Sequence, residues 1–227
     1  MYGDTDDLFR IEWAYLPLLN GDYGTTPKYI EKRLSADSKF FCEVISLVYR
    51  SKNIIKIEQE PTEEEKAIAT NAWHLLHEWR TPPGIQDNGD FDGAYFDEWL
   101  KEIWKMCSRT GHLEVAFLHI GQVLFFCPAD PSGLWVNKAA AEALNRKGAE
   151  EMRNGFCSAI FNSRGVHWVD PTGKPEKDLA KKYRQQANDV ESEGFQRLAA
   201  SLRSAADSYD READRIIDEH ESEDEEN

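Results

Sequence analysis

The sequence predicts an all-α fold, an antiparallel multi-helix domain with short loops. Almost every periodic segment has apolar residues at helical spacing, strand-like segments are scarce, and no strands alternate with helices. The expected exceptions are one short extended segment near 166–169 and the run at 113–126. That run is rich in β-branched and aromatic residues, as a strand would be, although its length favours a buried helix.

We expect residues 1–217 to form a single all-α domain, with a sub-boundary near 128–134. A chain of 227 residues that is 41% hydrophobic and 11% aromatic can bury a substantial core. Residues 218–227 hold seven acidic groups and no Lys or Arg. Because like charges at a terminus repel one another and stay solvated, this segment is predicted to be an acidic, frayed tail.

Three helices are predicted in the first quarter of the chain. The first covers residues 6–19 and should end or kink at Pro17. A short helix follows over 27–35, and the run at 40–49 is apolar almost all round, which is typical of a buried central helix. The expected core face of the first helix consists of Leu8, Ile11, Tyr15 and Leu18.

The next two helices have clear boundary signals. One should begin at a capping box made by Thr62 and Glu65 and end before the TPPG sequence at 81–84. The other carries an apolar stripe at helical spacing, made of Phe96, Trp99, Leu100, Ile103, Trp104 and Cys107. We expect its two tryptophans, like Trp73 and Trp79, to pack in the core rather than to form a stacking platform.

The C-terminal half is predicted to be helical with one irregular interruption. Residues 136–161 fit one or two helices with a break near 146–148. The stretch 162–175 is the longest segment with turn chemistry. Two long helices then close the chain. The last has one apolar face of about six turns, made of Phe195, Leu198, Leu202, Ala205, Ala206, Tyr209, Ala213 and Ile216.

Composition excludes several classes of function. The net charge of −15 argues against direct nucleic-acid binding, which needs a basic surface. No apolar run approaches the length of a spanning helix, and the acidic N-terminus is unlike a signal peptide, so we expect a cytoplasmic protein without membrane contact. The four cysteines lie far apart in sequence with no CxxC pair, which predicts buried small side chains in a reducing compartment rather than a zinc site.

The acidic stretch at 87–99, DNGDFDGAYFDEW, resembles a calcium loop in part. In EF-hand register, Asp90 and Asp92 fall on ligand positions, but the position of the bidentate glutamate is Trp99. We therefore interpret the stretch as a helix start, capped by Asp90 or Asp92 and beginning between Asp90 and Ala94. Both aspartates remain weak metal candidates.

His74 and His77 are the other weak metal candidates. They lie three positions apart and Glu78 follows them, whereas a metalloprotease helix has two histidines four apart with the glutamate between them. A metal pair on one helix face stays geometrically open. The favoured interpretation is a pair of solvent-edge histidines that flank two core leucines.

The polar loop at 162–170 is the best candidate for contact with a ligand or partner. Its candidate residues are Asn162, Ser163, Arg164, His167 and Trp168. A catalytic triad within this loop is disfavoured, because triad side chains are gathered from separate elements. The alternative is a rigid connection in which the side chains of Asn162 and Arg164 cap helix ends.

Several quoted segments recur in this order in one bacterial family: IEWAYLPLL, DNGDFDGAYFDEWL, GHLEVAFLHIGQVL, ADPSGLW, GFCSAIFNSRGVHW, GKPEKDLAKKYRQQA and SLRSAADSYDREADR. On these segments the chain resembles the C-terminal helical region of large, poorly characterised bacterial proteins, some of which carry helix-turn-helix annotations. The resemblance covers nearly the whole chain. It implies a bacterial, cytoplasmic setting and a partner-binding or scaffolding part of a larger, defence-type assembly, and it implies no reaction.

Together these observations predict a non-catalytic helical interaction or scaffold domain with a protein partner and no cofactor. The alternative is a metal-assisted hydrolase that uses His74, His77 and nearby carboxylates. The sequence leaves the partner and the oligomeric state open.

Overall fold

The computed structural model describes residues 3–19, 27–53, 60–165 and 168–225 of the chain. These residues form ten α-helices and one 3-10 turn and contain no β-sheet, so the predicted all-α class is confirmed. The elements are α1 (Gly3–Tyr15), η1 (Leu16–Leu18), α2 (Lys28–Ala36), α3 (Ser38–Val48), α4 (Glu63–Glu78), α5 (Gly93–Thr110), α6 (Leu113–Leu124), α7 (Lys138–Asn145), α8 (Glu150–Asn162), α9 (Lys174–Ser192) and α10 (Gln196–Glu225).

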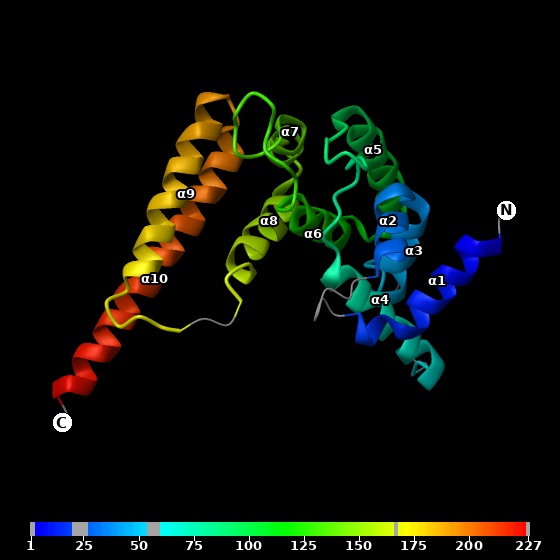
Figure 1. Cartoon of the computed structure of the whole chain (residues 1–227), viewed down its shortest axis with the longest axis horizontal. Coiled ribbons are helices and arrows are strands. Elements are labelled where there is room, and N and C mark those ends of the chain that lie inside the picture. Colours follow the sequence, from blue (N-terminus) through cyan, green and yellow to red (C-terminus); the bar gives the residue numbers. More distant parts are fainter. Residues whose placement is uncertain (1–2, 20–26, 54–59, 166–167, 226–227) are drawn as a thin grey trace.

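The helices are arranged as an arch. Helices α1 to α5 form one side, the α9–α10 hairpin forms the other, and α6, α7 and α8 lie between them (Figure 1). The N-terminus lies at one end of the long axis and the C-terminus at the other. A continuous cluster of buried side chains extends from Leu16 to Tyr209 and includes residues of both sides.

Most predicted helix boundaries are confirmed. Thr62 and Glu65 form the reciprocal capping box at the start of α4. Asp92 caps α5 by accepting a hydrogen bond from the Tyr95 backbone N–H at 2.9 Å, so the helix begins inside the predicted window. Pro17 lies in η1, directly after the end of α1. The ambiguous run at 113–126 is mainly helical, because α6 covers most of it.

The C-terminal half also follows the sequence pattern. Residues 136–161 contain two helices, α7 and α8, with the break after Asn145 and before Glu150. Two connections are longer than the short loops expected. The segment 79–92 is pinned by an isolated β-bridge between Ile85 and Phe91, and the segment 125–137 links α6 to α7.

Helices α6 and α8 cross at backbone contact. A Cβ placed on Gly121 would lie 1.9 Å from the carbonyl oxygen of Met152, and one placed on Gly155 would lie 1.9 Å from that of Leu118. Neither distance is sterically allowed for a carbon atom, so both positions require glycine. These two glycines therefore set the spacing of the two helices at the centre of the arch.

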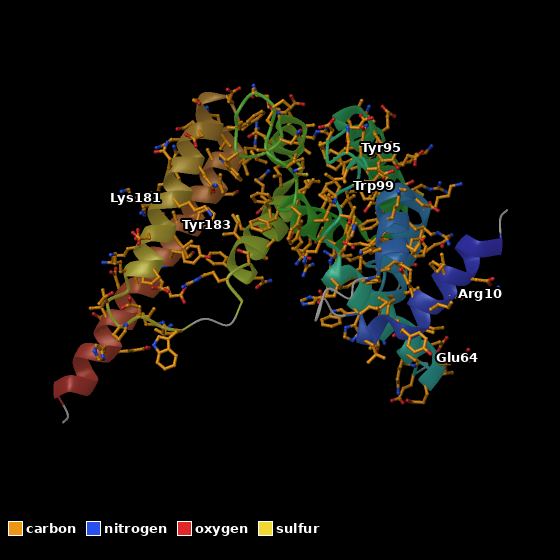
Figure 2. The ribbon with its side chains drawn as sticks, in the orientation of Figure 1. Arg10, Glu64, Tyr95, Trp99, Lys181 and Tyr183 are labelled. Atoms are coloured by element: carbon orange, nitrogen blue, oxygen red, sulfur yellow. The ribbon has the colours of Figure 1, made fainter. Side chains whose placement is uncertain are left out.

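The α9–α10 hairpin has a buried inner face and a charged outer face. Figure 2 shows Tyr183 on the inner side of α9, where it is 4% exposed, and Lys181 on the outer side. The start of α9 lies beside Ala213, because a Cβ on Gly173 would be 2.8 Å from the Ala213 carbonyl oxygen. Helix α10 continues from there to Glu225, and its end projects beyond the hairpin (Figure 1).

Several side chains predicted to be in the core are on the surface. Trp104 is 57% exposed and Trp73 is 44% exposed, whereas Trp79 and Trp99 are buried as expected. The predicted core face of the first helix was also partly wrong, because Ile11, Tyr15 and Leu18 are all about half exposed or more. A helical apolar stripe is wider than the face that a neighbouring helix covers, so its edges can stay in water.

Two further predictions concern segments that the structure describes only in part. Of the predicted extended segment at 166–169, residues 166 and 167 lie outside the described part, while Trp168 and Val169 have irregular backbone. The predicted acidic tail at 218–227 is helical as far as Glu225. In the described part of the chain, no helix is both long enough and apolar enough to cross a membrane.

Candidate functional site

A cleft of about 680 Å³ lies between the C-terminal ends of α4 and α8. Its walls come from three parts of the sequence: the end of α4 and the residues after it, the end of α6, and the end of α8. Its size is within the range of natural small-molecule and side-chain pockets. The lining residues are Leu76, His77, Trp79, Arg80, Gln122, Phe126, Ala159, Phe161, Asn162, Ser163 and Gly165.

The α4 wall of the cleft is fixed by two buried polar side chains of α2. The Glu31 carboxylate accepts hydrogen bonds from the backbone N–H groups of Arg80 and Thr81. Ser35 accepts a hydrogen bond from the Trp79 indole at 2.9 Å and donates to the Thr81 carbonyl. Burial raises the pKa of Glu31, and the two backbone N–H groups act in the opposite direction. These contacts hold the chain in place where it leaves α4.

Arg80 extends from this wall toward the end of α6. Its guanidinium carbon lies 5.1 Å from the centre of the Phe126 ring, a cation–π contact, and one nitrogen donates to the His77 carbonyl at 2.6 Å. Another nitrogen lies 3.6 Å from Glu78. The cleft thus combines an aromatic surface with a cationic group that is still 45% exposed.

The α8 wall supplies polar groups. Asn162 is exposed, and its side-chain amide has no hydrogen-bond partner within the described part of the chain. Ser163 donates its hydroxyl hydrogen to the Ile160 carbonyl at 2.7 Å, which satisfies the last turn of the helix. With Gln122 on the α6 side, the cleft carries two side-chain amides, each able to donate and accept hydrogen bonds.

The remaining candidates of the 162–170 loop lie elsewhere. Arg164 forms an ion pair with Glu176 at 2.7 Å, and both side chains are largely buried, at 15% and 1% exposure. Trp168 is 93% exposed and does not line the cleft. His167 is outside the described residues. Of the five predicted residues, the structure therefore brings Asn162 and Ser163 to the cleft and uses Arg164 in packing.

The triad that the sequence disfavours would use Ser163, His167 and Asp170, and of these the structure describes the first and the last. The Ser163 hydroxyl is directed at a backbone carbonyl. Asp170 accepts hydrogen bonds from the backbone N–H and the hydroxyl of Thr172, in the turn that leads into α9. Its carboxylate therefore belongs to a local turn.

A buried histidine lies behind the α6 wall. His119 is 6% exposed, and its Nε2 lies 2.8 Å from the Tyr49 hydroxyl. Burial lowers the pKa of His119 to about 4, the neighbouring Gln122 side chain acts in the opposite direction, and electrostatic repulsion from His77 adds to the lowering. His119 is consequently a neutral side chain at physiological pH.

The weak metal candidates do not converge. His77 lines the cleft, but its ring stacks on Trp73 with centroids 5.0 Å apart, while His74 meets the same indole edge-on at 5.1 Å. Asp90 accepts a hydrogen bond from the Asn88 side chain, and Asp92 caps α5. Among the described residues, no three His, Cys, Asp or Glu side chains group as metal ligands would.

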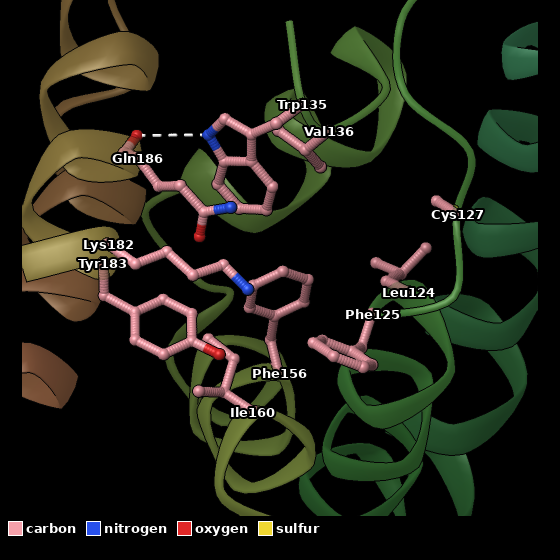
Figure 3. A pocket seen from close by; sticks show the side chains of 10 residues that line it. All are labelled: Leu124, Phe125, Cys127, Trp135, Val136, Phe156, Ile160, Lys182, Tyr183 and Gln186. Carbon is pink, nitrogen blue, oxygen red and sulfur yellow. Dashed lines mark hydrogen bonds between the residues drawn. The ribbon is translucent and has the colours of Figure 1, made fainter. Parts of the chain in front are cut away.

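A second, smaller cavity of about 90 Å³ lies between α8 and α9 (Figure 3). The Trp135 indole donates to the Gln186 carbonyl oxygen at 3.2 Å, and the Lys182 ammonium lies 5.3 Å from the centre of the Tyr183 ring. Most of the other lining side chains are apolar, including Leu124 and Phe156. At this size the cavity has room for ordered water but not for a sizeable ligand.

Comparison of this chain with known proteins identifies no relative. No protein-family model, no curated protein and no solved structure matches this chain. The resemblance to the helical region of large bacterial proteins therefore stays a prediction.

Sequence reasoning missed Arg80, Gln122 and Phe126 as cleft residues. No local pattern marks them, because each lies at or just beyond a helix end and meets the others only in the folded chain. The usable signal was weak. Trp79 and Arg80 begin the connection that contains the double proline, and connecting segments often carry binding residues.

Proposed function

We propose that this chain is a non-catalytic interaction domain of a bacterial cytoplasmic protein, and that its cleft holds a peptide segment of a protein partner. The observation that carries this proposal is the composition of the cleft. It combines exposed aromatic surface at Phe126, an exposed arginine and two side-chain amides. Aromatic residues and arginine are enriched in protein interfaces, and amides can pair with peptide groups on both their donor and acceptor sides.

The expected occupant is an extended peptide with one apolar anchor side chain. The aromatic wall would cover the anchor, while Gln122 and Asn162 would bond to its backbone. Arg80 favours an anchor that is followed by an acidic residue or a chain carboxylate. In this proposal, the protein partner expected from the sequence binds through a peptide segment that occupies the cleft.

Selection from a random-peptide display library tests this directly. Peptides enriched on the full chain should bind the wild type and lose at least tenfold in affinity for Phe126→Ala, which removes the aromatic wall. Trp104→Ala is the matched control, because Trp104 is a similarly exposed aromatic residue that does not line the cleft. Equal binding to Phe126→Ala and the wild type would place the peptide site elsewhere, and a failure to enrich any peptide would contradict the proposal.

The alternative of a metal-assisted hydrolase has one supporting observation, the presence of His77 in the cleft. Its imidazole is stacked on Trp73, and His74 meets the same indole edge-on, so both rings pack against one aromatic side chain. Stoichiometric zinc or manganese in the purified protein, lost in His77→Ala, would favour the hydrolase over the interaction domain.

A further inference from the structure

Two of the four cysteines meet in the fold although they are 65 positions apart in sequence. Cys42 of α3 and Cys107 of α5 have their sulfur atoms 3.2 Å apart. Both thiols are free. Since a disulfide bond is about 2.05 Å long, the two sulfurs need to approach by only about 1 Å to form one.

The contact makes the two thiols unequal. A hydrogen bond from the Cys42 thiol lowers the pKa of Cys107, and the same hydrogen bond raises the pKa of Cys42. The thiolate is the reactive form of cysteine, so Cys107 is the stronger nucleophile of the pair. Cys107 is 1% exposed, whereas Cys42 is partly exposed, so solvent reaches the pair from the side of Cys42.

The other two cysteines lack these features. Burial raises the pKa of Cys127, and it raises that of Cys157 to about 11. The Cys157 sulfur lies 3.7 Å from a backbone carbonyl oxygen, that of Ser201. Cys127 and Cys157 are thus inert internal controls for the first pair.

We propose that Cys42 and Cys107 form a site of reversible oxidation, at which a peroxide-class oxidant converts the two thiols into a disulfide that links α3 to α5. The Cys107 thiolate attacks one oxygen of hydrogen peroxide, which breaks the O–O bond, forms a sulfenic acid and releases hydroxide. The Cys42 sulfur then attacks the Cys107 sulfur, forming the S–S bond and releasing water. The two protons of the thiols end in the two water molecules produced, and a dithiol reductant reverses the change.

The disulfide would enclose the segment that contains α4 and the α4 wall of the cleft. A cross-link across a loop of this length restricts the unfolded chain strongly. The oxidised protein is therefore expected to melt roughly 5–10 °C above the reduced protein. This inference goes beyond the interaction function and does not depend on it.

Peptide mapping of the full chain tests the proposal. The protein is treated with hydrogen peroxide, its remaining thiols are blocked by alkylation, and it is digested without reductant. The expected result is a single cross-linked species that joins the peptides of Cys42 and Cys107, lighter by two hydrogens and lost after treatment with dithiothreitol. The Cys127→Ser/Cys157→Ser double variant should give the same species.

A variant in which one cysteine is replaced separates the two chemical steps. In Cys42→Ser the sulfenic acid on Cys107 has no partner thiol, so dimedone should trap it when the oxidised variant is unfolded in its presence, while the gain in melting temperature disappears. Circular dichroism of the reduced variant checks that it folds. Four alkylated thiols in the folded, peroxide-treated wild type, or a cross-link that involves Cys127 or Cys157, would overturn the proposal without recourse to any variant.

Discussion

Gly121 of α6 and Gly155 of α8 each lie against the backbone of the opposite helix. The contact is reciprocal, because Gly121 faces the Met152 carbonyl and Gly155 faces that of Leu118. It leaves no room for a methyl group on either helix. Since α6 provides the Gln122 side of the cleft and α8 provides another wall, this crossing holds these two walls against each other.

Gly155→Ala should destabilise the protein by about 2–4 kcal/mol, because the added methyl forces apart two helices packed at backbone contact. Urea unfolding followed by circular dichroism measures the loss. Gly148→Ala is the control, since Gly148 has open space around it and its backbone is not left-handed. Equal stability of the two variants would mean that the helices can separate without cost.

Removal of Arg164 should break an ion pair to a buried carboxylate. Arg164→Met is expected to cost about 2–4 kcal/mol, because Glu176 is 1% exposed and its ion pair with this arginine is lost. Lys177→Met removes a pair with Asp214 in which both side chains are more than half exposed, so it should cost less than about 0.5 kcal/mol. Chemical denaturation of both variants makes the comparison. A small effect at Arg164 would return that residue to the list of partner-binding candidates.

Stability should fall as His119 becomes charged in the unfolded chain. The pKa of His119 is about 4 in the folded protein and 6.5 when unperturbed, so the unfolded state takes up the proton first. The stabilisation by neutral His119 is complete above about pH 6.5 and is lost progressively as the pH falls toward 4.

The loss assigned to His119 between about pH 7.5 and about pH 5.5 is roughly 1–1.5 kcal/mol. It is measured as the difference in free energy of unfolding at the two pH values. Other groups titrate in the same range, so the quantity to compare is the pH dependence of the wild type minus that of His119→Gln. An identical pH dependence in the two proteins would show that the histidine is readily protonated in the fold.

Glu31 should act on the cleft through the backbone it holds. Glu31→Ala removes the acceptor for the backbone N–H groups of Arg80 and Thr81, and Glu12→Ala removes the acceptor for those of Tyr29 and Ile30. Each change should cost about 1–3 kcal/mol, and only the first should weaken binding of the selected peptides. Fluorescence anisotropy of a labelled peptide separates the two outcomes. Equal weakening by both variants would indicate a general loss of stability.

Helix boundaries could be predicted because their signals are local. The capping box at Thr62 and Glu65 and the Asp92 cap each involve residues within three positions of one another. The tryptophan at position 99 is buried in the core, as its place in the apolar stripe predicted. The prediction that Trp104 is also buried was wrong, because an apolar stripe does not show how wide a face the neighbouring helices cover.

The cleft and the cysteine pair could not be predicted because their parts are brought together only by the fold. His77 and Asn162 are on α4 and α8, whose relative placement depends on the glycine contact between α6 and α8. Cys42 and Cys107 were expected to be separate buried side chains, and nothing in their flanking residues indicates that they meet. Arg164 was selected as a polar loop residue, whereas its charge is neutralised by a glutamate twelve positions later.

The projecting end of α10 has an electrostatic consequence. From Ala213 to Glu225 the helix extends roughly 18 Å past the start of α9. Its last turn has no basic residue, and the sequence at 218–225 is strongly acidic, which is unfavourable at the negative end of a helix dipole. Added salt screens this repulsion, so the stability of this helix end should rise with ionic strength.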